Sequence, residues 1–142
     1  MWFVAGDEFA SGPVVDAVFP IYEQVIPAAP SGQVTFAMED LTSAVAALSP
    51  RRDTGITFRF ERLLDRVALS VDDGDGGLAQ TTVAASYEGA LPERLGLNAR
   101  YLRDLLGALG DERTVTVQVS GELDPVRVDS SGMAAVVMPM RV

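Results

Sequence analysis

Cysteine and histidine are both absent from this chain of 142 residues. Without cysteine the chain has no disulfide and no thiolate metal site, although this absence does not fix the cellular compartment. Without histidine it lacks the commonest general base and the commonest metal ligand. Serine, threonine and carboxylate side chains are plentiful, but no pairing of a nucleophile with a base stands out. We therefore expect a non-catalytic protein, not an enzyme, with no cofactor and no bound metal.

Long hydrophobic runs are missing as well. No apolar run approaches the roughly 18 residues that a membrane-spanning helix needs. The N-terminus, Met1 to Gly6, lacks the basic segment and following apolar run that mark a signal peptide. The sequence therefore predicts a cytoplasmic protein with no membrane partner.

Charge is mostly of one sign, because 20 acidic residues stand against 11 basic ones and give a net charge of -9. Such a surface repels nucleic acid and membranes, so contact with DNA needs a local gathering of basic residues. Since 48% of the residues are hydrophobic, the chain is not a disordered tail. Its length suits one domain with a substantial core.

The N-terminal passage up to Pro30 is irregular. Gly12-Pro13 and the prolines at 20, 27 and 30 break any long element. They leave room for a short strand from Trp2 to Val4, a second strand near Phe9, and a linker.

From Gln33 onward the hydrophobic pattern is regular and repeats once. The first unit comprises a strand at Val34 to Phe36, a helix over Met38 to Leu48 that Pro50 ends, and strands at Ile56 to Phe60, Val67 to Val71 and Leu78 to Tyr87. The second comprises a strand at Leu95 to Leu97, a helix over Ala99 to Leu109 between Asn98 as N-cap and Gly110, and strands at Thr114 to Ser120, Val126 to Asp129 and Ala134 to Met138.

Alternating strands and amphipathic helices favour an α+β fold of two β-α-β-β-β units, with two helices packed on antiparallel sheets. On the second helix we place these side chains toward the core: Tyr101, Leu102, Leu105, Leu106 and Leu109.

The last ten residues, Met133 to Val142, are almost wholly apolar and include Pro139. Because proline cannot donate to a sheet ladder, the strand around Val136 to Met138 lies at an edge or ends there. Methionines on both sides of the proline give an adaptable apolar surface of the kind that binding grooves use. Two interpretations stay open: a strand that closes the core, and one wall of a groove.

Three passages resemble the C-terminal, third domain of the bacterial DNA polymerase III beta subunit, the beta sliding clamp. Asp16 to Pro27 resembles the segment that enters that domain, Leu97 to Leu109 resembles its second helix, and Val136 to Val142 resembles its terminus. The resemblance implies a single DNA-clamp-type domain at 19–142. It also implies that residues 1–18 are the remnant of a preceding clamp-domain strand and linker.

The resemblance further implies a hydrophobic pocket for short linear motifs of polymerases and repair proteins. Aliphatic walls suit a Leu or Phe of such a peptide, and a strand end offers backbone hydrogen bonds. Packing of the core and terminus is the alternative role for these residues. Carried over by position, the pocket residues are Pro20, Gln24, Val25, Pro125, Val136, Val137, Met138, Pro139, Met140 and Arg141.

Two further surfaces follow from the resemblance. The resemblance implies that Arg51, Arg52, Arg100 and Arg103 contact duplex DNA without sequence preference. The first helix, however, has no basic residue, and these four arginines can equally be a solvated surface. A subunit contact is assigned to Ala47, Leu48, Ile56, Phe58 and Phe60.

An acidic run from Asp72 to Gly76 superficially resembles a calcium loop. The EF-hand pattern needs a glutamate at its twelfth position, and Val83 stands there, inside an expected strand. A β-hairpin turn is the better interpretation.

The leading hypothesis is a sliding-clamp-like replication and repair protein that binds clamp-interaction peptides. It would contribute to a DNA-encircling ring of six clamp domains, as a homo-oligomer or docked on a full-length clamp. The alternative is a stand-alone regulator or decoy that binds clamp partners without encircling DNA, which the acidic charge favours. Whether the chain is a fragment or a single-domain protein stays open.

Overall fold

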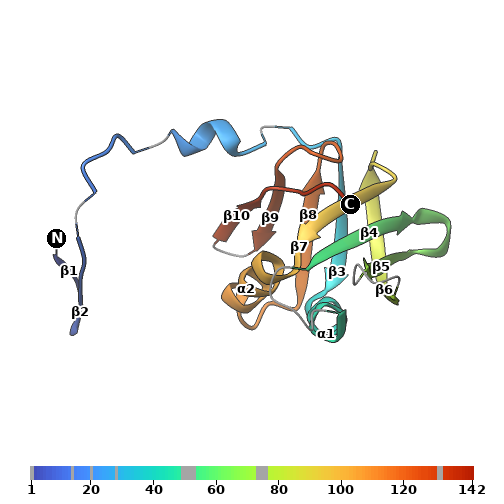
Figure 1. Cartoon of the computed structure of the whole chain (residues 1–142), viewed down its shortest axis with the longest axis horizontal. Coiled ribbons are helices and arrows are strands. Elements are labelled where there is room, and N and C mark those ends of the chain that lie inside the picture. Colours follow the sequence, from blue (N-terminus) through green and yellow to red (C-terminus); the bar gives the residue numbers. More distant parts are fainter. Residues whose placement is uncertain are drawn as a thin grey trace.

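The computed structural model of the chain describes residues 2–13, 15–19, 21–27, 29–48, 54–72, 77–130 and 133–142. Strands β1 (Trp2–Ala5) and β2 (Glu8–Ser11) form an antiparallel hairpin that turns at Gly6, whose φ is +62°. Figure 1 shows this hairpin standing away from the rest of the molecule at the end of an extended linker. The two N-terminal strands are therefore confirmed. The boundary at residue 18 stays a prediction.

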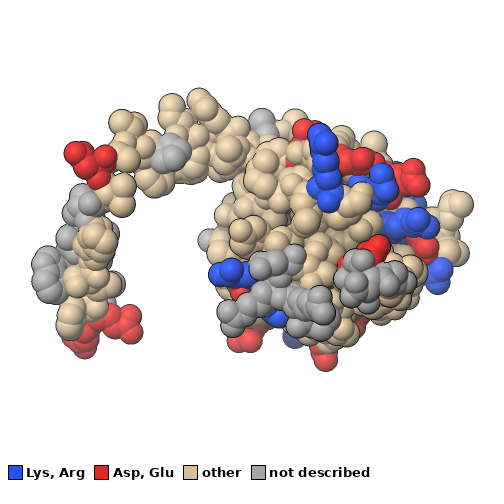
Figure 2. Space-filling view, viewed as in Figure 1, with Lys and Arg blue, Asp and Glu red and all other residues tan. Residues whose placement is uncertain are grey.

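The N-terminal arm, residues 2–30, carries only acidic charges (Figure 2). All arginines of the sequence lie from residue 51 onward, outside the arm. Its linker contains a short 3-10 helix, η1 (Tyr22–Val25), that the sequence pattern did not predict. The arm joins the body at Ser31, whose Oγ lies 3.1 Å and 2.9 Å from the carbonyl oxygens of Val119 and Ser120. This anchor fixes where the body begins.

The body is one eight-stranded antiparallel sheet in the order β10-β9-β8-β3-β6-β5-β4-β7, with two helices on one face (Figure 1). The strands of the first unit are β3 (Gly32–Ala37), β4 (Gly55–Glu61), β5 (Arg66–Asp72) and β6 (Leu78–Gly89). Those of the second are β7 (Arg94–Asn98), β8 (Thr114–Val119), β9 (Val126–Ser130) and β10 (Met133–Val137). The predicted α+β class and the two β-α-β-β-β units are thus confirmed.

The sheet interlocks the two units. Each half contains the last three strands of one unit and the first strand of the other: β10-β9-β8-β3 on one side and β6-β5-β4-β7 on the other. The first residue of each helix is held by a hydrogen bond to the residue just before a strand of the other unit. Met38 N donates to the carbonyl of Arg113 just before β8, and Ala99 N donates to that of Thr54 just before β4, each at 2.9 Å. The sequence repeat is therefore a structural repeat.

Helix α1 (Met38–Leu48) packs on β3, β5 and β6, and α2 (Ala99–Leu109) packs on β7, β10 and α1. Asn98 Oδ1 accepts hydrogen bonds from the backbone N–H groups of Arg100 and Tyr101 at 2.9 Å and 3.3 Å, so the predicted N-cap is confirmed. Gly110 ends α2 with φ at +65°. The placement of Tyr101 toward the core was wrong, because its side chain is 59% exposed.

The core fills the space between the sheet and the helices. The interior space beside Phe36, Leu41 and Val126 is only about 10 Å³, which is at the lower limit for one water molecule. No ligand cavity therefore lies inside the described part of the core. Of the helices in the described residues, none is long and apolar enough to cross a membrane.

The chain past β10 crosses to the opposite edge of the sheet. After Val137 the segment Met138–Val142 runs back toward β7, where Met140 N donates to the carbonyl of Gly96 at 2.9 Å. Figure 1 shows the C-terminus lying over β7 and β4. The predicted edge position of the strand before Pro139 is confirmed, and this C-terminal segment ties the two sheet edges together.

Candidate functional site

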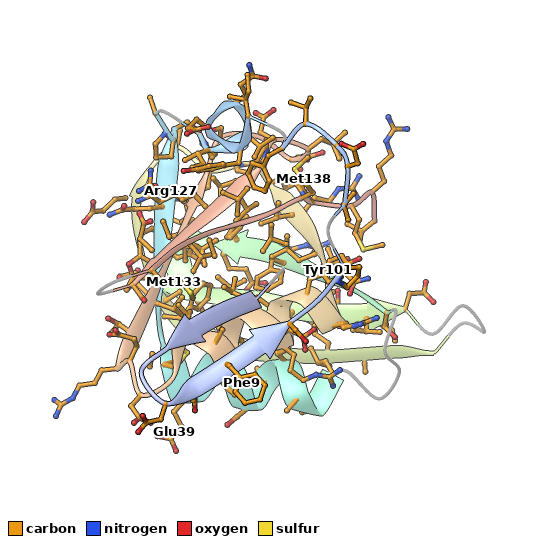
Figure 3. The ribbon with its side chains drawn as sticks, turned by 90° about the vertical axis from the view of Figure 1, so that its left-hand side faces the viewer. Phe9, Glu39, Tyr101, Arg127, Met133 and Met138 are labelled. Atoms are coloured by element: carbon orange, nitrogen blue, oxygen red, sulfur yellow. The ribbon has the colours of Figure 1, made fainter. Side chains whose placement is uncertain are left out.

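A surface groove of about 370 Å³ lies between α2 and β10. Its walls are Tyr101, Asp104 and Leu105 from the helix and Ala135, Val136, Val137 and Met138 from the strand and its end. We call it the α2–β10 groove. Figure 3 labels Tyr101 and Met138 on the side of the molecule that carries both elements.

The groove combines a packed floor with an exposed rim. Leu105 and Val137 are buried in the core, at 9% and 8% exposure, so they hold the floor in place. Tyr101 and Met138 are 59% and 58% exposed, so they are available to a partner. A depression with a fixed apolar floor and an adaptable methionine at its rim suits an aliphatic or aromatic side chain.

One polar group marks the rim of the groove. The Asp104 carboxylate lies 3.8 Å from Arg100 Nε, one helical turn away, and both side chains are at least half exposed. A surface pair of this kind contributes little to stability. It places a carboxylate and a guanidinium beside an apolar floor, where they can orient a bound peptide.

A second groove, of about 440 Å³, lies where the linker passes the β8–β9 loop. Three predicted pocket residues line it: Gln24, Val25 and Pro125. A third groove, of about 250 Å³, lies beside the C-terminal segment, and Met140 and Arg141 line it together with Arg94, Gly96, Glu122, Leu123 and Val142.

The predicted pocket residues are thus distributed over three grooves rather than gathered in one. Val136, Val137 and Met138 share the α2–β10 groove, whereas Met140, two residues further along the chain, lines the third groove. Pro139 stands between Met138 and Met140 in the sequence and is half-buried, and Pro20 lies outside the described residues. The peptide site as a whole stays a prediction.

Four residues of the α2–β10 groove were not among the predicted pocket residues: Tyr101, Asp104, Leu105 and Ala135. For Tyr101 and Leu105 the available signal was their spacing of four residues, which puts both on one side of a helix. Placing Tyr101 in the core hid that signal, although a tyrosine with an apolar ring and a polar hydroxyl is common at binding surfaces.

The predicted DNA and subunit residues have mixed positions. Arg100 and Arg103 are exposed on α2, with Arg100 beside Asp104, while Arg51 and Arg52 lie outside the described residues. Leu48, Ile56 and Phe58 are core residues with at most 4% exposure, so their side chains offer no surface to another subunit. Ala47 is exposed and Phe60 is half-buried against Tyr87, which leaves these two as the accessible part of the predicted contact.

Metal binding finds no support in the part of the chain that the structure describes. No group of three or more acidic side chains there is close enough to hold a metal ion. The acidic turn at Asp72 to Gly76 lies largely in the stretch 73–76, outside the described residues, and β5 and β6 pair on both sides of it, as a hairpin requires.

Comparison with known proteins relates the whole chain to one family. No family model matches it. It is 28% identical to the beta sliding clamp of Synechococcus elongatus over 145 residues and 30% identical to that of Caulobacter vibrioides over 152 residues, covering 98% and 99% of this chain. The chain is related to the bacterial beta sliding clamps. It spans 38% of the length of these clamps, a share consistent with one clamp domain.

Solved clamp structures share its fold. A sliding clamp from Bartonella birtlesii, determined bound to griselimycin, superimposes with a TM-score of 0.81 and 29% identity over 90% of this chain and 35% of that clamp. A beta sliding clamp from Caulobacter crescentus, with polyethylene glycol bound at a proposed beta-motif tethering region, gives a TM-score of 0.79 and 27% identity over the same 90% and 35%.

Proposed function

We propose that this chain is a non-catalytic sliding-clamp domain, corresponding to the third clamp domain, that binds short linear motifs of DNA replication and repair proteins. The observation that carries the proposal is the α2–β10 groove, an apolar depression whose floor is fixed by the core and whose rim is exposed. A solved structure similar to this chain is named as the beta subunit of DNA polymerase III, so we propose that the chain acts at replicating DNA in the cytoplasm.

Peptide binding follows from the chemistry of the groove. A Leu or Phe side chain placed on Val137 and Leu105 loses its contact with water, and Met138 can adapt to its shape. The Tyr101 ring supplies a flat apolar wall with a polar tip. Gln24, Val25 and Pro125 would receive another part of the same extended peptide in the groove by the linker.

A titration tests this directly. A fluorescein-labelled peptide with a consensus clamp-binding motif should bind saturably, and the same peptide with its apolar residues changed to alanine should not. Met138→Asp and Tyr101→Ala should each weaken binding about tenfold, about 1.4 kcal/mol, without unfolding the chain, because both side chains are more than half exposed. Leu63→Ala is the matched control, since Leu63 is fully exposed on a remote turn. No binding at high micromolar peptide contradicts the proposal.

A DNA-encircling ring is the larger assembly that the clamp relatives suggest. Six copies of this 15.1-kDa chain, about 90 kDa, would supply the six domains of such a ring, with Arg100 and Arg103 and, outside the described residues, Arg51 and Arg52 as phosphate contacts.

The second candidate function is a regulator that occupies clamp-binding peptides without encircling DNA. The surface of α1 favours it, because the helix exposes Glu39 and Asp40 and has no basic residue. Light scattering separates the two: a mass near 90 kDa supports the ring, and a monomer or dimer supports the regulator.

A further inference from the structure

The two halves of the sheet meet between β3 and β6, and the internal repeat points to a second junction of the same kind. Strand β6 pairs with β5 along its first part and then with β3, from Ala85 opposite Phe36 to Gly89 opposite Gly32. The equivalent strands in the other unit are β10 and β7, the two outer strands of the sheet. At this second junction Met138–Val142, rather than β10, reaches β7.

Gly96 in β7 is the point of contact. Its carbonyl accepts the hydrogen bond from Met140 N at 2.9 Å, and it is buried. A Cβ atom at Gly96 would lie 2.4 Å from Met140 O and 2.6 Å from Val142 Cγ1, far inside van der Waals contact. The backbone of the C-terminal segment therefore lies directly on a position that only glycine can fill without moving it.

Gly55 in β4 extends this surface. It pairs with Asn98 at the end of β7, and a Cβ atom at Gly55 would lie 3.1 Å from Met140 Sδ. The Met140 side chain thus rests over a second glycine. We call Gly96 and Gly55 the glycine seat.

We propose that the glycine seat is a positioning element for the peptide groove: it holds Met140, and through Pro139 it sets where Met138 stands at the groove rim. This inference rests on the proposed peptide-binding function. Proline fixes its own φ and restricts the residue before it to extended conformations, so Met138, Pro139 and Met140 form a stiff connection. Anchoring its far end at Gly96 limits the positions open to Met138, and a preorganised rim binds more tightly than one that must be ordered first.

The decisive variant is Gly96→Ala, compared with Gly107→Ala as matched control. Gly107 lies on the exposed face of α2, where an added Cβ meets nothing within 4 Å. Gly96→Ala should weaken binding of the labelled peptide at least about tenfold, and Gly107→Ala should change it less than about twofold. Unchanged affinity in Gly96→Ala overturns the proposal.

Amide hydrogen exchange separates release of the C-terminal segment from general destabilisation. In Gly96→Ala the Met140 amide should lose its protection while the amides of Val34 and Phe36 in β3 keep theirs. A Met140 amide that stays protected overturns the proposal. Val83→Ala, a buried change in β6 on the far part of the sheet, should lower the unfolding midpoint yet leave peptide affinity unchanged. Equal loss of affinity in Val83→Ala would assign the effect to stability alone.

Failure of the proposed function is visible separately. If the unchanged chain binds no peptide, the function is wrong. Exchange at Met140 and the NMR shift of the Met138 methyl group in Gly96→Ala still report whether the glycine seat positions the rim.

Discussion

The first unit, β3 to β6, ends in a strand of 12 residues, whereas the second, β7 to β10, ends in a strand of five residues. The long strand β6 is bonded on both sides and joins the two sheet halves. The short strand β10 is bonded to β9, and Met138 and Pro139 follow it. The same architecture thus makes a closed junction in one unit and an accessible one in the other.

The two junctions differ in how much apolar surface they leave accessible. At the first junction every apolar residue of β3 that faces the helices is buried, including Val34 and Phe36 at 1% exposure. At the second the missing strand pairing leaves Val136 and Met138 accessible beside α2. The groove thus lies where the last strand is short and is followed by a proline that cannot continue the ladder.

The largest expected effect comes from breaking the closed junction. Phe36→Ala removes a fully buried ring at the centre of β3 and should cost about 3–5 kcal/mol of unfolding free energy. The equivalent Leu97→Ala in β7 should cost about 2–4 kcal/mol, because it deletes a smaller side chain. Urea unfolding followed by circular dichroism measures both. A smaller loss for Phe36→Ala than for Leu97→Ala would reverse the ranking of the junctions.

Glycine-to-alanine substitutions test how rigid each of the two junctions is. Gly89, at the end of β6, has φ at +70°, and a Cβ atom there would lie 2.4 Å from the carbonyl oxygen of Ser31. Gly89→Ala should therefore cost about 2 kcal/mol, since neither the backbone angle nor the anchored Ser31 can yield. Gly96→Ala should cost about 1 kcal/mol, because the C-terminal segment can detach. Equal costs in urea unfolding would mean that both junctions are equally rigid.

Local patterns in the sequence predicted most of this fold. Both helices begin and end as expected, at Met38–Leu48 and Ala99–Leu109, because their apolar spacing and the Asn98 cap are local signals. Every strand of the sheet was found within a few residues, since alternation reports which face is buried. The short 3-10 helices η1 and η2 (Arg62–Leu64) were missed, because single turns leave no periodic signal.

The candidate site was harder to predict because it depends on which elements become neighbours. The pattern of α2 could not show that Tyr101 stands at the edge of β10 rather than over the core. Nor could the pattern of β4 show that Ile56 and Phe58 are buried within the chain itself. Contacts between residues far apart in the sequence decide both questions.

The helix starts give a smaller test of the comparison between units. Asn98→Ala removes the cap of α2 and should cost about 1 kcal/mol, while Asn98→Ser should retain most of it. Unit one has Ala37 at the equivalent place, so α1 begins without an asparagine cap. Thermal unfolding of the three proteins measures the effect. No change in Asn98→Ala would mean that the bond from Ala99 N to Thr54 alone holds the start of α2.

The smallest expected effect is a pH dependence at the closed junction. Tyr87 lies in β6 opposite Val34, and its hydroxyl donates to the carbonyl of Arg66. Burial raises the pKa of Tyr87 above its ordinary value of about 10, and the nearby carboxylates of Glu61 and Asp65 add to the rise. The unfolded chain therefore loses this proton at lower pH than the folded chain does. The contribution of Tyr87 to stability is complete below about pH 10 and is lost as the pH rises through the folded pKa.

Urea midpoints between about pH 9 and about pH 11 should show this loss as a decline, and Tyr87→Phe should flatten it while lowering stability at the lower pH. Tyr22→Phe, in the exposed linker, is the matched control and should leave the slope unchanged. If the urea midpoint declines with pH equally in Tyr87→Phe and in the unchanged chain, Tyr87 is not the cause of the decline. The closed junction would then be stabilised by the backbone hydrogen bonds between β3 and β6 and by core packing alone. The two junctions would then differ in packing and not in side-chain polar contacts.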